Sequence, residues 1–142
     1  MSPLSKSNKL YTLSNDLIER IKSIAKSGIS FTQGDVLFKE GEHKEFIYLI
    51  EKGMVSLVKD NNESNNKKVE IMNQNDGDIV GVDLVFNDKD CEYSALVTEP
   101  SILYKVLIAD FKELLSKNSD SSLELIKYLS SLVTKLEKKK LA

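Results

Sequence analysis

Short apolar segments lie between residues 31 and 57, and glycines separate them. The runs 36–38 and 46–50 are apolar, and a third run follows at 54–58; the glycines between and around them are Gly34, Gly41 and Gly53. Glycine adopts the positive φ angles of tight turns at no steric cost. The spacing therefore predicts β-strands that end at these glycines and face a common interior with their apolar side chains.

Helical periodicity appears at both ends of the chain. Ser14 is a suitable cap for a helix over 14–26, and a second helix is expected over 110–116. Ser121 and Glu124 form a capping-box pattern at the start of a long helix over 121–141. The elements between them are expected as an exposed polar loop (59–68), strands (69–72, 93–97 and 102–106, the last two hinged at Pro100) and a short helix (83–88). The predicted division is an N-terminal arm (1–13), a β-rich domain with flanking helices (14–120) and a C-terminal helix (121–142).

The glycine-rich stretch closely resembles the opening half of a cyclic-nucleotide-binding domain, as found in catabolite activator proteins, Crp/Fnr-type regulators and cyclic-nucleotide-dependent kinases. The matching residues are Gly34, Asp35, Leu37, Phe38, Glu40, Gly41, Glu42, Ile47, Tyr48, Ile50, Gly53 and Val55. The resemblance implies a mainly β fold: a double-stranded β-helix, or jelly-roll-like β-roll, with an N-terminal helix and C-terminal helices, the last one long. Most of these residues build the fold and do not contact a nucleotide, so function needs a separate argument.

In this family a cassette binds the ligand; it reads Phe-Gly-Glu, then a few small or apolar residues, then Arg followed shortly by Ala. Val82 stands where the family has its glutamate, so the acceptor for the ribose hydroxyl is missing unless Asp83, one residue later, takes its place. Glu92 and Tyr93 stand where the family's arginine should precede Ser94 and Ala95. Arg20 is the only arginine in the chain, which leaves Lys89 as a point charge. The predicted ligand pocket comprises Gly81, Val82, Asp83, Leu84, Lys89, Glu92, Tyr93, Ser94 and Ala95.

Losing both charged contacts should weaken cyclic-nucleotide binding, because each charge-assisted hydrogen bond contributes about 1.5–3 kcal/mol. We therefore expect a regulatory domain that does not bind cAMP or cGMP in the usual way. Two alternatives follow: a pocket for a different, less anionic small-molecule effector, or a vestigial pocket in a dimerising or docking scaffold. The backbone amides after Gly81 leave weak anion binding open.

The last predicted helix carries leucines at spacings of four, three and four, which is typical of a helix-packing seam: Leu125, Leu129, Leu132 and Leu136. Ile126 and Val133 add apolar surface on a second face. A homodimer is expected through this helix, and packing on its own domain is the alternative. In Crp/Fnr-type regulators the corresponding helix leads into a helix-turn-helix domain. A sensor module of a longer regulator and a free-standing domain both remain open.

Composition argues against several other functions. A net charge of −2 gives no reason to expect direct nucleic-acid binding, and the apolar runs are too short for a membrane span, so the cytoplasm is the expected location. The chain has one cysteine, Cys91, and one histidine, His43. These are too few ligands for a typical metal or haem site, so no cofactor is expected. A redox role for Cys91 is disfavoured because Asp90 and Glu92 flank it. Catalytic motifs are lacking, so we expect no enzyme.

Overall fold

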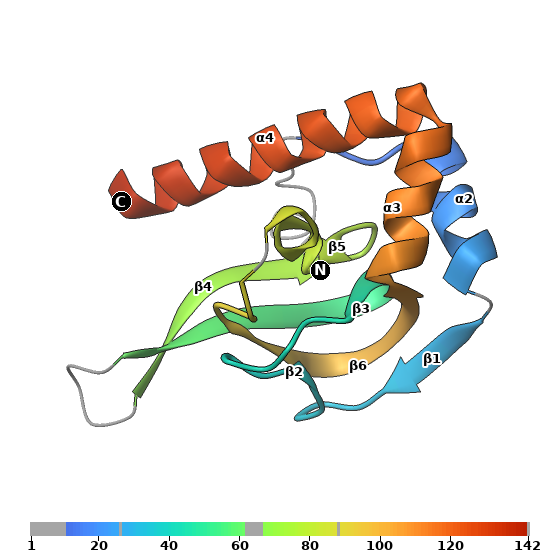
Figure 1. The fold of residues 1–142 in the computed structure, drawn as a ribbon. Helices are drawn as coiled ribbons and strands as arrows, with labels where there is room; N and C mark the ends of the chain where they lie inside the picture. Colours follow the sequence, from blue (N-terminus) through green and yellow to red (C-terminus); the bar gives the residue numbers. More distant parts are fainter. Residues whose placement is uncertain (1–10, 26, 62–66, 88, 142) are drawn as a thin grey trace, which may run out of the picture.

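The computed structural model describes residues 11–25, 27–61, 67–87 and 89–141, and it confirms a mainly β fold with flanking helices (Figure 1). The helices are α2 (Asn15–Ala25), the 3₁₀ helix η1 (Val82–Phe86), α3 (Ile108–Lys117) and α4 (Ser119–Leu141). The strands are β1 (Gly28–Phe31), β2 (Val36–Phe38), β3 (Phe46–Asn61), β4 (Lys67–Asn75), β5 (Ile79–Val80) and β6 (Ser94–Leu107). No helix within the described ranges is long and apolar enough to cross a membrane.

Two long antiparallel strands, β3 and β6, form the centre of the single sheet. They pair from Phe46 opposite Leu107 to Val58 opposite Ser94. Strands β1 and β2 pair with β6, whereas β4 and β5 pair with β3. The predicted hinge at Pro100 is wrong, because β6 runs through that residue as one strand.

Gly53 has the expected positive φ, but it does not end a strand as predicted. It lies inside β3, where the register with β6 shifts, and its φ is 127°. A Cβ atom at this position would lie 1.9 Å from Ser101 Oγ and 2.7 Å from Ser101 Cα. The glycine therefore permits both the irregular backbone and the close approach of β6.

The first half of β3 is buried on both faces. Ile47 and Leu49 contact the helices, whereas Tyr48 and Ile50 belong to a second apolar cluster within the sheet. The predicted single interior is therefore replaced by two clusters. This arrangement explains why residues 46–50 are continuously apolar, as in strands covered on both sides.

The helices meet in the first cluster, where α2 contributes Leu17 and Ile21, α3 contributes Phe111 and α4 contributes Leu125 and Tyr128. Figure 1 shows α4 crossing over η1 and β5, with α2 and α3 packed near its beginning.

Ser14 caps α2 as predicted, because its Oγ accepts a hydrogen bond from Leu17 N at 3.2 Å. The predicted capping box of α4 is wrong: the helix already begins at Ser119, and Ser121 is buried inside it. Glu124 instead accepts hydrogen bonds from the backbone N–H of Ser14 and from Ser14 Oγ, the latter at 2.7 Å. The carboxylate thereby joins α4 to the start of α2.

Both ends of the predicted polar loop 59–68 are strand. β3 extends to Asn61 and β4 begins at Lys67, with Lys59 opposite Val69. The side chains of residues 59, 60 and 67–70 are exposed. The polar composition of this segment is therefore that of two solvent-exposed strands at the edge of the sheet. The tip, 62–66, lies outside the described residues, as does most of the predicted arm. The last arm residue, Leu13, is buried among the helices.

Candidate functional site

The cassette begins with a tight turn into η1. Gly81 has a φ of 87° and precedes this helix of five residues. The backbone N–H of Leu84 donates to the carbonyl of Gly81 at 3.0 Å, which closes the turn. Val82, Leu84 and Ala95 are all buried in the core. These residues hold the cassette in place, and their side chains are apolar.

Asp83 and Tyr93 join the two ends of the cassette. The hydroxyl of Tyr93 donates a hydrogen bond to Asp83 Oδ1 at 2.5 Å. Tyr93, which with Glu92 is predicted to stand where the family has its arginine, is only 7% exposed. Burial raises the pKa of Tyr93 well above its usual value, and the negative charge of Asp83 raises it further. The phenol therefore stays protonated at neutral pH and acts as the donor to Asp83.

The structure identifies which carboxylate reaches the site. Val82, predicted to stand where the family has its glutamate, is fully buried and packs in the helix cluster. Asp83 lines a cavity beneath α4 together with Tyr93. The cassette thus contributes to this cavity a tyrosine and an aspartate that are bonded to each other.

The remaining polar cassette residues lie away from this cavity. Lys89 and Glu92 are exposed, and Lys89 Nζ lies 3.9 Å from Glu92 Oε1. The buried Oγ of Ser94 accepts a hydrogen bond from the backbone N–H of Glu40 at 2.8 Å. The Glu40 carboxylate in turn accepts one from Asp60 N at 3.1 Å, a structural role consistent with its position in a turn. Among the cassette residues, only Asp83 and Tyr93 line the cavity.

The cavity between α4 and the sheet, called here the α4 cavity, has a volume of about 140 Å³. Most of its lining is apolar. The lining residues are Leu57, Ile71, Met72, Gln74, Asp83, Tyr93, Leu129, Leu132, Val133 and Leu136. Sequence reasoning missed the contribution of β4, because Lys67–Asn75 carries mainly polar side chains and resembles an exposed strand.

Gln74 is the buried polar residue of this lining, at 2% exposure. Its Nε2 donates to the carbonyl of Ile79 at 3.2 Å and to the hydroxyl of Tyr128 at 3.3 Å. The same hydroxyl accepts from Ile79 N and donates to Asp78 Oδ1 at 3.1 Å. Within the described part of the chain, Gln74 Oε1 has no hydrogen-bond partner.

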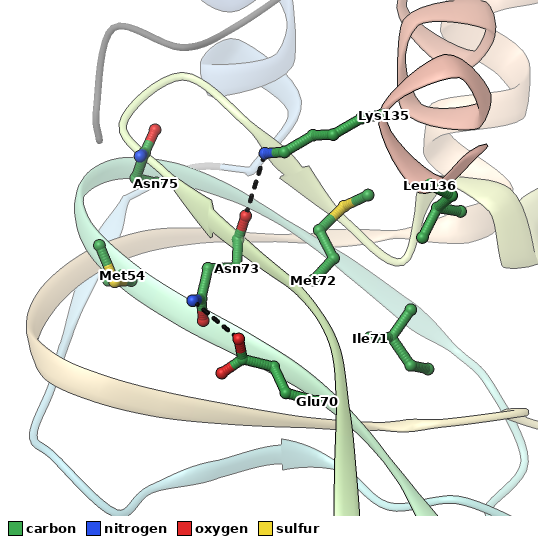
Figure 2. A pocket seen from close by; sticks show the side chains of 8 residues that line it. All are labelled: Met54, Glu70, Ile71, Met72, Asn73, Asn75, Lys135 and Leu136. Atoms are coloured by element: carbon green, nitrogen blue, oxygen red, sulfur yellow. Dashed lines mark hydrogen bonds between the residues drawn. The ribbon is translucent and has the colours of Figure 1, made fainter. Parts of the chain in front are cut away.

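A second, more polar pocket of about 240 Å³ adjoins the α4 cavity and shares Ile71, Met72 and Leu136 with it. Figure 2 shows Lys135 Nζ pointing to the backbone carbonyl of Asn73, at 3.5 Å. The side chain of Asn73 donates to Glu70 Oε1 at 3.1 Å. Glu70 and Lys135 both line this pocket, so its formal charges cancel. No residue of the cassette lines it.

Cys91 is buried, and its backbone pairs with that of Gly41 and Glu42. Burial raises the pKa of the Cys91 thiol, and the nearby charge of Glu42 raises it further. The side chain of His43 is exposed, with Nδ1 3.7 Å from Asp90 Oδ1. Among the described residues, no group of His, Cys, Asp and Glu side chains is arranged to hold a metal ion.

The predicted seam of α4 faces the domain itself. Leu125 is buried in the helix cluster, and Leu129 and Leu132 pack against it. Leu136 is 37% exposed at the edge of the α4 cavity. A second apolar surface, called here the outer α4 patch, consists of the exposed residues Phe86, Leu123, Ile126 and Val133.

Comparison with known proteins identifies one family. The model of the cyclic nucleotide-binding domain matches residues 29–118. A search of curated proteins finds no match to the chain.

Several solved structures share the fold. The catabolite activator protein of Thermus thermophilus matches with a TM-score of 0.73 and 16% identity, over 89% of this chain and 58% of that one. The sensor domain of the transcriptional regulator DNR from Pseudomonas aeruginosa gives a TM-score of 0.66 and 21% identity, over 89% and 81% of the two chains.

A third match is the regulatory subunit of a cAMP-independent protein kinase A from Trypanosoma brucei, in a mutant form bound to cAMP in its A site. Its TM-score is 0.68 and its identity 20%, over 92% of this chain and 46% of that one. The chain thus spans about half the length of the activator protein and of the kinase subunit. At these identities the similarity concerns the fold alone.

Proposed function

The chain belongs to the cyclic nucleotide-binding domain family, and we propose that it is a non-catalytic, ligand-sensing regulatory domain that does not bind cAMP or cGMP in the usual way. In this proposal it forms the effector half of a Crp/Fnr-like transcriptional regulator and acts in the cytoplasm.

The hydrogen bond between Tyr93 and Asp83 is the observation that carries this proposal. A cyclic nucleotide presents a phosphodiester anion, which in this family pairs with an arginine. Here the corresponding side chain is a neutral phenol, and the group beside it is a carboxylate. The lining of the α4 cavity contains no lysine, arginine or histidine. An entering phosphate would therefore meet a negative charge and no compensating cation.

The kinase subunit from Trypanosoma brucei supports this interpretation. It is described as cAMP-independent, and the form bound to cAMP carries three substitutions, one of which introduces an arginine. This fold thus occurs in a kinase subunit described as cAMP-independent, and the form of it that is bound to cAMP carries an added arginine.

The direct test is calorimetric titration with cAMP and cGMP up to millimolar concentrations. We expect no saturable binding by the unaltered protein, whereas Tyr93→Arg should gain measurable affinity. Val82→Glu is unsuitable as a companion substitution because Val82 is fully buried and a charge there would destabilise the core. Thr98→Arg is the matched control, since it adds the same charge at an exposed position of β6.

Micromolar binding of either nucleotide by the unaltered protein would refute the proposal whatever the variants do. Urea unfolding of Tyr93→Arg checks that the variant is folded before its titration is interpreted.

The outer α4 patch favours a second candidate function, a dimerising or docking scaffold with a vestigial pocket. Ile126 is 62% exposed and Val133 is 54% exposed, one heptad apart on α4, and Phe86 of η1 lines a groove with Ile126. Apolar side chains repeated on one face of a helix are typical of helix pairing. We therefore place the proposed homodimer contact on this patch and not on the leucine seam.

Sedimentation of Ile126→Glu tests the dimer. The variant should have the mass of one chain under conditions where the unaltered protein has the mass of two. Gln33→Glu, in the exposed turn after β1, is the charge-matched control. A monomeric unaltered protein, or a dimer unaffected by Ile126→Glu, would contradict the placement. A dimer that binds neither cyclic nucleotides nor other small molecules would favour the scaffold over the sensor.

A further inference from the structure

Asp83 is the charged residue of the α4 cavity, and every other residue of the lining is apolar or neutral. Asp83 belongs to the lining and is also exposed, which places it at the border between the cavity and water. Among the described residues, no lysine, arginine or histidine forms an ion pair with Asp83. Its carboxylate is therefore a negative group beside an apolar space, and the described part of the chain gives it no positive partner.

Tyr93 fixes the position of this carboxylate. The Tyr93 hydroxyl donates to Asp83 Oδ1 at 2.5 Å, and Tyr93 is itself a buried residue of the same lining. A carboxylate has two oxygens and about four acceptor sites, so the bond from Tyr93 leaves sites for donors from a ligand. Because Asp83 is exposed, a ligand can reach these sites.

The rest of the lining favours a compact, apolar body. Leu129, Leu132 and Leu136 come from α4, whereas Leu57 and Met72 come from the sheet. The volume, about 140 Å³, is close to that of an engineered apolar cavity of about 150 Å³ that holds benzene. The cavity therefore has room for a body of about one aromatic ring next to the Asp83 carboxylate.

We propose that the α4 cavity binds a small organic amine, with its apolar body in the cavity and its ammonium group donating to the Asp83 carboxylate. This inference rests on the proposed function, because it names the class of effector for the same site. Hydrogen bonds between two charged groups are stronger than those between neutral groups, so a positive head group is favoured over a neutral one. A negative head group would meet Asp83 without a cation in the lining.

The probes are 4-fluorobenzylamine, 4-fluorobenzyl alcohol and 4-fluorobenzoate. They share one ring and differ in the head group, which at neutral pH is positive in the amine, neutral in the alcohol and negative in the benzoate. Fluorine NMR of each probe, titrated with protein at neutral pH, follows binding without background from the protein.

We expect saturable binding of the amine in the millimolar range, about tenfold weaker binding of the alcohol, and still weaker binding of the benzoate. Asp83→Asn removes the charge but keeps an acceptor for Tyr93, and it should lower the ratio of amine affinity to alcohol affinity by about tenfold. The ratio cancels differences in the stability of the variant. Asp60→Asn, which removes the same charge from an exposed position of β3, is the matched control and should leave the ratio unchanged.

Ile71→Phe tests whether the apolar body lies in the cavity. The substitution enlarges a lining side chain and leaves Asp83 in place, so it should weaken the amine and the alcohol together. Urea unfolding checks that this variant is folded, and the affinity ratio in Asp83→Asn decides the inference without it.

Four results would overturn the inference: no saturable binding of the amine, equal affinities of the amine and the alcohol, an unchanged affinity ratio in Asp83→Asn, or unchanged binding by folded Ile71→Phe. The titration with cAMP separates this failure from failure of the proposed function. Micromolar cAMP binding refutes the proposed function directly. Absence of both cAMP and amine binding refutes only the assignment of the effector class.

Discussion

Replacing Tyr93 by phenylalanine removes one hydroxyl and leaves the ring, which packs beside Phe38 with ring centroids 5.7 Å apart. The lost hydrogen bond has a charged acceptor, for which about 1.5–3 kcal/mol is typical. Asp83 is exposed, so water can replace the lost hydrogen bond after the substitution, and the lower end of this energy range applies. We expect Tyr93→Phe to reduce the free energy of unfolding by about 1.5 kcal/mol at pH 8.

The destabilising effect of this substitution should shrink at high pH. The pKa of Tyr93 is raised in the folded state by burial and by Asp83, whereas an unfolded tyrosine ionises near pH 10. The stabilisation is therefore fully present below about pH 10. Above that value the unfolded chain releases a proton that the folded chain retains, so stability falls by about 1.4 kcal/mol per pH unit. Phenylalanine lacks this proton, and the two proteins should become equally stable near pH 11.

Urea unfolding followed by far-ultraviolet circular dichroism at pH 8, 10 and 11 measures both effects. Contributions from the other tyrosines are common to both proteins and cancel in the difference. A double-mutant cycle with Asp83→Ala isolates the pair. A stability difference that stays constant from pH 8 to pH 11 would refute the idea that a neutral phenol is held against Asp83. No difference at pH 8 would refute the hydrogen bond itself.

Three further predictions concern the fold, and each is tested by measuring the free energy of unfolding in urea. Gly53→Ala should lower the free energy of unfolding by more than about 3 kcal/mol or prevent folding, because the new Cβ would overlap Ser101. A loss below about 1 kcal/mol would contradict the close approach of β6 to β3 at this point. Leu125→Ala should lower the free energy of unfolding by about 2–5 kcal/mol, whereas Leu123→Ala, on the exposed side of α4, should lower it by less than about 1 kcal/mol. Equal losses would contradict the burial of only one face of α4. Tyr128→Phe should cost about 1–3 kcal/mol, because its hydroxyl makes three buried hydrogen bonds, and an unchanged midpoint would refute that network.

The sequence was sufficient for the fold because local signals agreed with one another. Gly34 and Gly41 have the positive φ angles that their positions predicted, at 98° and 90°. Ser14 caps α2, and the apolar run 46–50 is a buried strand. The errors involve partners far apart in the chain. The register shift at Gly53 and the contact of Glu124 with Ser14 depend on distant residues that no local pattern identifies.

The candidate site was only partly predictable. Loss of the arginine follows from composition, since Arg20 is the only arginine and it lies on α2. Asp83 was already the carboxylate expected from the sequence, and the 3₁₀ turn after Gly81 explains why: Val82 enters the core and Asp83 lines the cavity. Lys89 was a candidate by charge alone, and its neighbour Glu92 pairs with it in solvent.

Gln74 was missed for a different reason, one that bears on how the site works. Its strand has the composition of an exposed hairpin, and the residue is buried because α4 brings Tyr128 onto it from 54 positions away. The hydroxyl of Tyr128 fixes the orientation of the amide, and that orientation leaves Oε1 as the unpaired acceptor. The same helix supplies Leu129, Leu132 and Val133 to the lining. The lining of the cavity is therefore set by the docking of α4, the same helix that carries most of the outer α4 patch.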